Sequence, residues 1–292
     1  MLMYDFEIKR INQEIKKRKA KRVLIQLPEG LKHEFVKIAD KLAAEAVLSG
    51  DPCFGACDIQ TVPETDLTIH FGHSKMLDTD KIVYVETHSV ADVGPVAKKA
   101  ARMLTGKRIG LVTTIQHVEE LPKVKKMLER LGKKVVIGGP VLGCDASNAE
   151  NINMKVDEFL FIGSGRFHGI GVAYFTGKKV LLADPYTNIV SGIDPLKSYK
   201  EKYLRIAKAS DSAIFGIIVG SKPGQRKMGV AEKARKKLER RGKRTYLVIM
   251  NEITPERLDY LPFDAFVVTA CPRIVIDDWK NYKKPLLLPE EI

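Results

Sequence analysis

The sequence has few of the features that mark secreted or membrane-embedded proteins. It holds only four cysteines and one tryptophan in 292 residues, so a disulfide framework is not expected. It has no run of the roughly 18 apolar residues that span a membrane, and its N-terminus lacks the basic and then apolar order of a secretory signal. We therefore expect a soluble cytoplasmic protein that does not contact membranes and keeps its thiols reduced.

Acidic residues are also scarce, with 36 against 49 basic ones, which gives a formal net charge of +13 at pH 7. Such an excess occurs in proteins that bind nucleic acid or an acidic partner. The densest basic runs, residues 16–22 and 233–244, lie on segments with helical periodicity, where charge on the solvent face is ordinary. We therefore expect no direct nucleic-acid binding, and keep a basic nucleic-acid-associated protein with a structural metal as an alternative.

The hydrophobic pattern occurs three times along the chain. Each pass has a β-like apolar segment, a helical segment and further β-like segments, which is the order of a parallel α/β sheet. We predict an α/β protein with three similar parallel-sheet domains arranged around a pseudo-threefold axis with a central site. The predicted domains cover residues 1–92, 93–188 and 189–292.

Two helices are predicted in the first domain. The first is amphipathic and covers residues 1–20. The second contains Phe35, Ile38, Leu42 and Ala46, because these apolar residues recur at helical spacing.

Three cysteines follow apolar β-like segments, one in each predicted domain: Cys57, Cys144 and Cys271. In open parallel sheets, ligands bind at the carboxyl ends of the strands, so three converging domains would bring these thiols to one site. Cys57 and Cys144 are each followed by aspartate. Cys53 has no counterpart in the second domain, and we interpret it as a small buried hydrophobic residue.

Thiolates select soft metals, chiefly zinc and iron–sulfur clusters. Structural zinc sites typically use short spacings such as C-x2-C, which the sequence lacks. Single cysteines from separate domains fit a cluster at an interface, where three ligands leave one iron open. From the residues alone, buried unreactive cysteines, a zinc site and a lone nucleophile stay open as alternatives.

Seven segments resemble the signature segments of the diphthamide synthase family, in the family's order, and the likeness extends from residue 21 to about residue 278. They are Leu-Pro-Glu-Gly-Leu at 27–31, Gly-Asp-Pro-Cys-Phe-Gly-Ala-Cys-Asp at 50–58, Ile-His-Phe-Gly-His-Ser at 69–74, Gly-Ser-Gly-Arg-Phe-His at 163–168, Asp-Pro-Tyr at 184–186, Gly-Ser-Lys-Pro-Gly-Gln at 220–225 and Ala-Cys-Pro-Arg at 270–273.

The resemblance implies a homodimer in which each subunit holds a 4Fe-4S cluster on Cys57, Cys144 and Cys271. S-adenosylmethionine would bind at the open iron. An electron donor would reduce the cluster, which would cleave the bond between sulfur and the γ-carbon and release a 3-amino-3-carboxypropyl radical. This group would be added to C2 of a histidine imidazole on translation elongation factor 2. The usual C-x3-C-x2-C motif of radical S-adenosylmethionine enzymes is absent, because Gln60 stands at its third position.

Further site residues are predicted around S-adenosylmethionine. Arg273, two residues after Cys271, is predicted to bind its carboxylate through paired hydrogen bonds. Two turns between a strand and a helix are predicted to offer backbone donors. They contain Pro28, Glu29 and Gly30, with Glu29 near the ammonium, and Gly224 and Gln225. Ordinary connecting turns are the alternative interpretation.

His73 and His168 also follow β-like segments. They are predicted to be catalytic residues that shape the channel for the incoming imidazole or remove its proton after the group has been added. Structural histidines held by hydrogen bonds are the alternative.

A quinolinate synthase-like enzyme is the second enzyme that we consider. It too resembles three α/β units around a three-cysteine 4Fe-4S cluster, but it condenses small molecules without S-adenosylmethionine. The Phe-Gly-Ala-Cys-Asp and Cys-Pro-Arg segments favour diphthamide synthesis.

Overall fold

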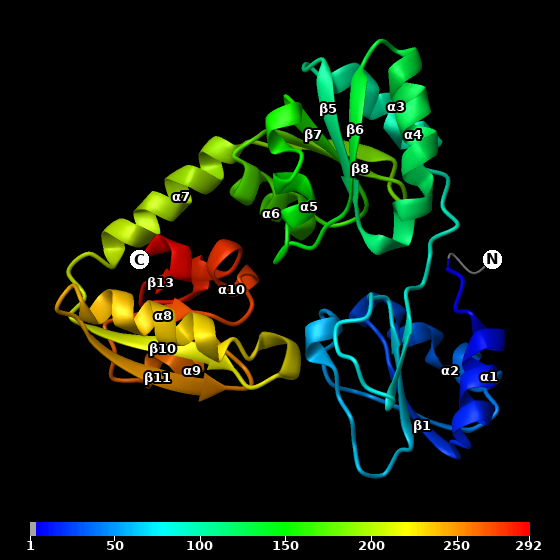
Figure 1. The fold of residues 1–292 in the computed structure, drawn as a ribbon, viewed down its shortest axis with the longest axis horizontal. Coiled ribbons are helices and arrows are strands. Elements are labelled where there is room, and N and C mark those ends of the chain that lie inside the picture. Colours follow the sequence, from blue (N-terminus) through cyan, green and yellow to red (C-terminus); the bar gives the residue numbers. More distant parts are fainter. Residues whose placement is uncertain (1–3) are drawn as a thin grey trace. The chain divides into compact units, whose positions relative to one another are not determined.

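The computed structural model describes residues 4–292, and the first three residues of the predicted N-terminal helix lie outside the described part. In this part the chain forms three sheets, which follow one another along the sequence (Figure 1). By compactness it divides into two units. The first comprises the residues up to Ala91 together with Lys222–Gly224, and the second comprises Asp92–Ser221 and Gln225–Ile292.

The first sheet is parallel, with strand order β2-β1-β3-β4. Its strands are β1 (Arg22–Gln26), β2 (Glu45–Leu48), β3 (Leu67–Phe71) and β4 (Ile82–Val85). Its helical segments are α1 (Ile8–Arg18), η1 (Glu29–Glu34), α2 (Phe35–Ala39) and η2 (Ala56–Asp58). One face of this sheet carries the apolar core, in which Ile25 and Ile69 pack with Ile11, Ile15 and Ile38 of the two α-helices.

The predicted helix through Ala46 is wrong. Helix α2 ends at Ala39, and Glu45–Leu48 forms strand β2. This segment pairs in parallel with β1, and the backbone N–H of Ser49 donates to the carbonyl of Ile25 at 2.9 Å. Pairing at the sheet edge satisfies these backbone groups, and it overrides the helical spacing of the apolar residues.

The second sheet has the order β6-β5-β7-β8-β9. Its strands are β5 (Arg108–Thr113), β6 (Lys134–Pro140), β7 (Glu158–Ile162), β8 (Val180–Asp184) and β9 (Ile189–Ile193). Its helical segments are α3 (Gly94–Met103), η3 (Ile115–Glu120), α4 (Leu121–Arg130), α5 (Ser147–Glu150), η4 (Asn153–Lys155) and α6 (Phe167–Thr176). The strands pair in parallel except β9, which is antiparallel to β8.

This second sheet is buried on both faces, so successive residues of a strand enter different cores. In β7, Leu160 and Ile162 pack with α3 and α4, whereas Phe159 and Phe161 pack with α5 and α6. Figure 1 shows α3 and α4 beside β5 and β6.

The third sheet is parallel, with the order β11-β10-β12-β13. Its strands are β10 (Ile214–Gly220), β11 (Arg244–Met250), β12 (Ala265–Val268) and β13 (Leu286–Leu287). Its helical segments are α7 (Pro195–Lys208), η5 (Pro223–Gln225), α8 (Met228–Glu239), α9 (Pro255–Asp259), α10 (Arg273–Ile276), η6 (Trp279–Asn281) and η7 (Pro289–Glu291). The first four strands of each sheet thus follow one order, which confirms the predicted α/β class with three similar sheets. Among residues 4–292, no helix is both long and apolar enough to span a membrane.

One aspartate contact occurs in all three repeats. Just before the third strand, a carboxylate accepts hydrogen bonds from two successive backbone N–H groups where the first strand begins. Asp66 accepts from Lys21 and Arg22, Asp157 from Lys107 and Arg108, and Asp264 from Ala213 and Ile214, at 2.7–3.1 Å. These bonds favour the charged carboxylate and lower the pKa of Asp66 and Asp264. At Asp157 the side chain of Arg108 lowers the pKa most, and the backbone bonds add to this effect.

We predict that Asp157→Asn destabilises the protein at neutral pH. Hydrogen bonds from Arg108 lower the pKa of Asp157 to about 2. A lowered pKa stabilises the fold above the unfolded value of about 3.9, and this contribution is lost as the pH falls toward the folded value. The difference in urea midpoint between wild type and variant should therefore be full at pH 7 and shrink below about pH 4. Asp211→Asn, at an exposed turn, is the control, and an equal effect of both variants would contradict the prediction.

Candidate active site

Cys57 lies in the short helix η2, at the end of the loop that follows β2, and is half-buried. The next residue, Asp58, anchors this loop. One of its carboxylate oxygens accepts the backbone N–H of Phe54 at 2.8 Å, and the other pairs with Lys222 Nζ at 2.5 Å. Both partners belong to the first compact unit. The contacts of Asp58 thus hold the loop that carries the Cys57 thiol.

Gly224 lies directly against Cys57. A Cβ on Gly224 would lie 2.5 Å from Cys57 Cα and 2.6 Å from the sulfur of Met76. Atoms do not approach this closely, so only glycine fits here without displacing the Cys57 loop. This contact places one of the predicted site residues beside a predicted ligand cysteine.

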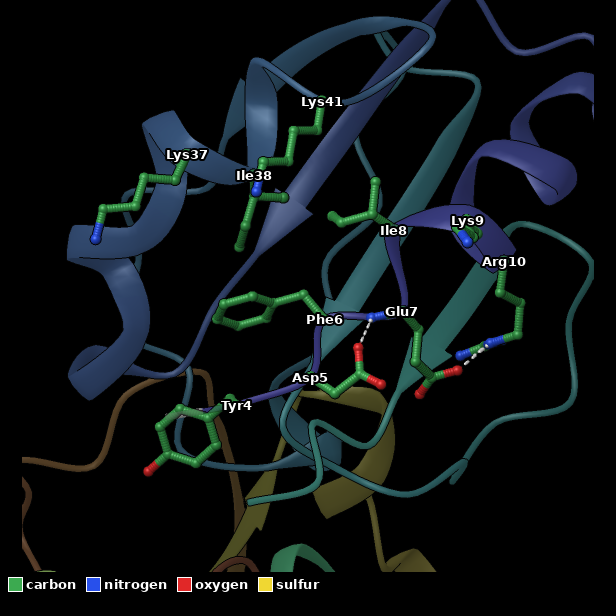
Figure 2. Close-up of a pocket in the computed structure, with 10 residues that line it drawn as sticks. All are labelled: Tyr4, Asp5, Phe6, Glu7, Ile8, Lys9, Arg10, Lys37, Ile38 and Lys41. Atoms are coloured by element: carbon green, nitrogen blue, oxygen red, sulfur yellow. Dashed lines mark hydrogen bonds and ion pairs between the residues drawn. The ribbon is translucent and has the colours of Figure 1, made fainter. Parts of the chain in front are cut away.

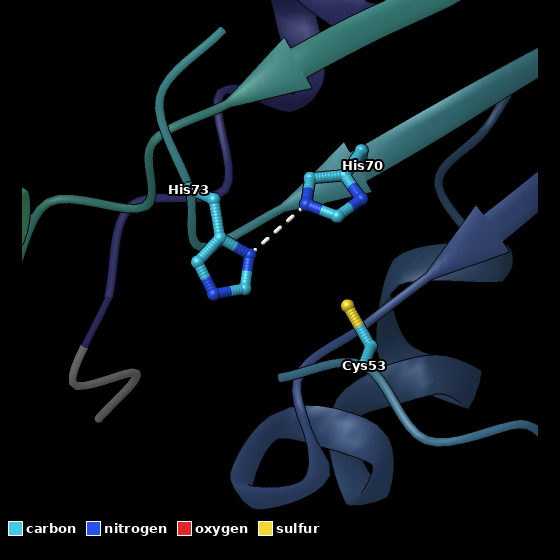
Figure 3. Close-up of side chains that lie close together, drawn as sticks. All are labelled: Cys53, His70 and His73. Carbon is cyan, nitrogen blue, oxygen red and sulfur yellow. Dashed lines mark hydrogen bonds between the residues drawn. The ribbon is translucent and has the colours of Figure 1, made fainter. Parts of the chain in front are cut away.

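A buried polar cluster lies at the same end of the first sheet (Figure 3). His70 Nε2 and His73 Nδ1 are 2.9 Å apart, and His70 Nδ1 is 2.9 Å from Gln26 Oε1. The sulfur of Cys53 lies within 4.8 Å of nitrogens of both histidines, so these three side chains are also candidate ligands for a metal ion.

Burial determines the charge of this cluster. It lowers the pKa of His70 to about 3, and His73 adds to this effect. It lowers the pKa of His73 to about 4, because the lost hydration of an imidazolium outweighs the opposing effects of the Asp58 carboxylate and the Phe71 backbone. Burial, assisted by the Asp58 carboxylate, raises the pKa of the Cys53 thiol to about 12. At neutral pH the two imidazoles and the thiol are therefore uncharged.

Cys144 lies at the corner of a tight turn after β6. Leu142 and Asp145 exchange two backbone hydrogen bonds across this turn, at 2.9 and 3.1 Å. The turn packs on helix α6. A Cβ on Gly143 would lie 2.4 Å from the ring of Phe167, and a Cβ on Gly171 would lie 2.5 Å from the carbonyl oxygen of Gly143. The cysteine is therefore positioned by close backbone packing.

His168, in the first turn of α6, contacts the Cys144 turn directly. The backbone N–H of Gly143 donates to His168 Nδ1 at 3.0 Å. Because a backbone N–H can only donate, Nδ1 is the acceptor and the proton of the neutral ring is on Nε2. His168 therefore presents an N–H donor beside Cys144.

Cys271 follows β12 and precedes helix α10. Arg273, in the first turn of α10, places its guanidinium carbon 5.3 Å from the centre of the Phe167 ring. Its Nε is 3.5 Å from the carboxylate of Asp277, and its side chain is 45% exposed. Phe167 thus contacts both the Cys144 turn and Arg273 from the Cys271 loop. Within the second unit, the structure therefore connects these two cysteine loops through one aromatic ring.

The other predicted residues lie on turns. Pro28 directly precedes η1 and packs on the loop after β3, since a Cβ on Gly72 would lie 2.7 Å from its ring. The Glu29 carboxylate pairs with Lys32 Nζ at 2.7 Å, and Gly30 is exposed. Gln225 ends η5, where its Cβ lies close to Gly220.

A pocket of about 490 Å³ lies in the first unit and contains none of the predicted site residues (Figure 2). It is lined by Tyr4, Asp5, Phe6, Glu7, Ile8, Lys9, Arg10, Lys37, Ile38 and Lys41. At this pocket the Glu7 carboxylate pairs with Arg10, and the Glu7 backbone N–H donates to Asp5. We assign no chemistry to this pocket.

Gln26 and His70 were missed by the sequence analysis. A signal was present, because each is a polar residue near the end of an otherwise largely apolar strand, and both are buried. A buried polar side chain in such a strand needs a polar partner, and the equivalent positions of neighbouring parallel strands can provide one.

Known proteins resemble the chain over most of its length. A family model described as "Putative diphthamide synthesis protein" matches residues 27–292. The 2-(3-amino-3-carboxypropyl)histidine synthase of Pyrococcus horikoshii is 37% identical, over 100% of this chain and 90% of that protein. Subunit 1 of the corresponding Schizosaccharomyces pombe synthase is 32% identical, over 99% of this chain and 72% of that protein.

A solved structure is similar as well. The crystal structure of Dph2 from Pyrococcus horikoshii with a 4Fe-4S cluster matches with a TM-score of 0.87 and 36% identity. The match covers 99% of this chain and 90% of that chain.

We predict opposite effects for two helical Gly→Ala variants. Alanine favours a helix over glycine by up to about 1 kcal/mol, so Gly229→Ala in α8, where a Cβ meets nothing within 4 Å, should raise the free energy of unfolding. Gly171→Ala in α6 drives a methyl group into the backbone of Gly143. This overpacking should lower the free energy of unfolding by about 1–3 kcal/mol. Urea denaturation measures both. Stabilisation by Gly171→Ala would show that the Cys144 turn does not depend on this contact.

Proposed function

Because the chain belongs to the diphthamide synthesis protein family, we propose that it is a 2-(3-amino-3-carboxypropyl)histidine synthase. In this proposal it transfers the 3-amino-3-carboxypropyl group of S-adenosylmethionine to C2 of a histidine imidazole on translation elongation factor 2. One observation carries the proposal. Each of the three repeated sheets ends, at the carboxyl edge of its parallel strands, in a loop with one half-buried cysteine.

The three cysteines fit a 4Fe-4S cluster as ligands. Cys57, Cys144 and Cys271 carry thiols, the donors that such clusters require. Cys57 and Cys144 are held by glycine contacts that leave no room for a side chain. When bound and reduced, the cluster supplies the electron for cleavage between the sulfur and the γ-carbon of S-adenosylmethionine. Cys53, which is 2% exposed, lies in the polar cluster with His70 and His73 and is not assigned as a ligand.

Arg273 and His168 are proposed to orient the amino acid portion of S-adenosylmethionine. The ring of Phe167 supports the Arg273 guanidinium, whose terminal nitrogens suit paired hydrogen bonds to a carboxylate. His168 holds its Nε2–H as a further donor on the same helix as Phe167. These contacts orient the γ-carbon and bind the ligand without taking a proton from it.

His73 is proposed as the acceptor of the proton that leaves the target imidazole. Its ring is neutral at working pH, because burial lowers its pKa to about 4. It lies in the loop after β3, at the carboxyl edge of the first sheet. A neutral imidazole at such an edge can act as a general base.

The two turns are proposed to line the S-adenosylmethionine pocket. Gly224 supports the Cys57 loop by its close contact, and Gln225 contributes an amide from the same turn. Pro28, Glu29 and Gly30 form the turn after β1. The Glu29 carboxylate already pairs with Lys32, so it would bind the ammonium group by exchanging this partner.

The remaining parts of the proposal concern partners and location. We propose a cytoplasmic homodimer that receives electrons from a separate donor and docks elongation factor 2.

The first test is the metal content of protein purified without oxygen. We expect about four iron and four sulfide per chain. Cys144→Ala should lose the cluster yet keep its fold, whereas the control Cys53→Ala should keep the iron. Zinc or no metal in folded wild type would contradict the proposal, and full iron in Cys144→Ala would reject the three-cysteine ligand set.

The second test concerns Arg273. Arg273→Ala should leave the iron content unchanged and weaken S-adenosylmethionine binding by at least about tenfold, because a charge-assisted hydrogen bond contributes about 1.5–3 kcal/mol and tenfold corresponds to about 1.4 kcal/mol. Isothermal titration on the anaerobic protein measures the affinity. Arg257→Ala, at an exposed ion pair with Glu252, is the control. Equal affinity of wild type and Arg273→Ala would refute this role.

A further inference from the structure

Gln26 and His70 occupy matched positions on the polar face of the first sheet. They are direct partners in the parallel register of β1 and β3. Their neighbours Ile25 and Ile69 point into the apolar core, so alternation places Gln26 and His70 on the opposite face. Both are nonetheless buried, at 1% and 0% exposure. Buried polar groups need partners, and the contacts of this pair show which atoms donate and which accept.

The amide of Gln26 has one orientation that satisfies its contacts. One end lies 2.7 Å from the carbonyl oxygen of Asp58, which only accepts, and the other end lies 3.3 Å from the backbone N–H of Gln60, which only donates. The NH2 group therefore faces Asp58, and Oε1 faces Gln60. The same Oε1 is 2.9 Å from His70 Nδ1. An amide oxygen cannot donate, so His70 Nδ1 carries the proton.

The position of the proton on His70 also determines the position of the proton on His73. With its proton on Nδ1, the neutral His70 ring has a lone pair on Nε2 and accepts a hydrogen bond there. The partner at 2.9 Å is His73 Nδ1, which must then be the donor. The neutral His73 ring is left with a lone pair on Nε2. The backbone carbonyl of Asp58, the residue after Cys57, thus sets the tautomer of His73 through two intervening side chains.

The proposed reaction requires such an acceptor. The bond between sulfur and the γ-carbon breaks, a bond between this carbon and C2 of the imidazole forms, and the C2–H bond breaks. One electron is taken up when the sulfonium is cleaved, and one electron is released when the adduct radical loses its C2 proton and regains the aromatic ring. The net products are the thioether left from S-adenosylmethionine, the substituted imidazole and one proton, so atoms, charge and electrons balance. The proton needs a base with an available lone pair.

We propose that Gln26 and His70 are positioning residues that hold His73 in its Nδ1-protonated tautomer, so that His73 Nε2 accepts the proton lost from the target imidazole. This inference rests on the proposed function for its chemistry, whereas the tautomer follows from the fold alone. His168 is held in the opposite tautomer by Gly143 and presents a donor. The two histidines are therefore not interchangeable.

A direct test reads the tautomers by NMR. Long-range proton–nitrogen correlation on the full chain with ring-¹⁵N histidine and an oxidised cluster should show Nδ1–H at His70 and His73, and Nε2–H at His168. In Gln26→Leu the signals of His70 and His73 should shift toward a mixture of tautomers, while those of His168 stay unchanged. Nε2–H at His73 in wild type would overturn the proposal. So would stoichiometric zinc that depends on Cys53, because a metal on both rings would replace the proton between them.

A second test separates cleavage from transfer. His73→Ala should keep its iron and still release 5′-methylthioadenosine from S-adenosylmethionine, while modification of the histidine on elongation factor 2 falls at least tenfold. Added imidazole should restore part of the transfer. Gln26→Leu should show the same uncoupling, and His33→Gln, whose side chain is 67% exposed, should behave as wild type.

If His73→Ala transfers the group at the wild-type rate, with one transfer for each S-adenosylmethionine cleaved, His73 is dispensable and its role as the base is refuted. Wild type that releases no 5′-methylthioadenosine would refute the proposed function instead, and the tautomer measurement would stand independently of that result.

Discussion

The pairing of the first and third strands in each repeat is the constraint on which the rest of the structure depends. Asp66, Asp157 and Asp264 each bind the first strand through two backbone N–H groups, and each returns its own N–H to a carbonyl of that strand. These contacts fix the register at the start of both strands. Because parallel strands of similar length then end together, the loops that follow them emerge at one edge of each sheet, where a cysteine loop is found.

The three repeats use this edge differently, because their sheets are covered differently. The second and third sheets have apolar cores on both faces. In the first sheet one face is apolar, and the loop that contains Cys53 and Asp58 contacts the polar residues of the other. Burial keeps His70 and His73 neutral, and at His73 it outweighs the nearby Asp58 carboxylate. A repeated architecture thus provides a pair of neutral, hydrogen-bonded histidines on the polar face of the first sheet.

Much of the fold was accessible from the sequence. Buried strands such as Ile214–Gly220 are continuous apolar runs. The same order of strand and helix segments occurs three times in the sequence, and this predicted three similar sheets. Strand β2 could not be predicted from the sequence, because its residues do not alternate between buried and exposed. Its extended conformation is determined by pairing with β1. Strand β9 was missed as well. Its antiparallel pairing with β8 departs from the repeated pattern.

For the candidate site, the sequence identified residues but not their relations. Cys144, His168 and Arg273 lie far apart in the chain, and their connection through Phe167 and Gly143 arises from packing on helix α6. Gln26 escaped notice because its role depends on register, which a single sequence does not display.

The tautomers show most clearly why geometry has to be added to composition. His73 and His168 are the same residue type in similar positions after a strand, and the sequence assigned them one shared role. A backbone N–H fixes His168 as a donor at Nε2, and a backbone carbonyl acting through Gln26 and His70 fixes His73 as an acceptor there. Backbone groups have fixed polarity, so the fold itself determines which histidine can take a proton and which can only give a hydrogen bond.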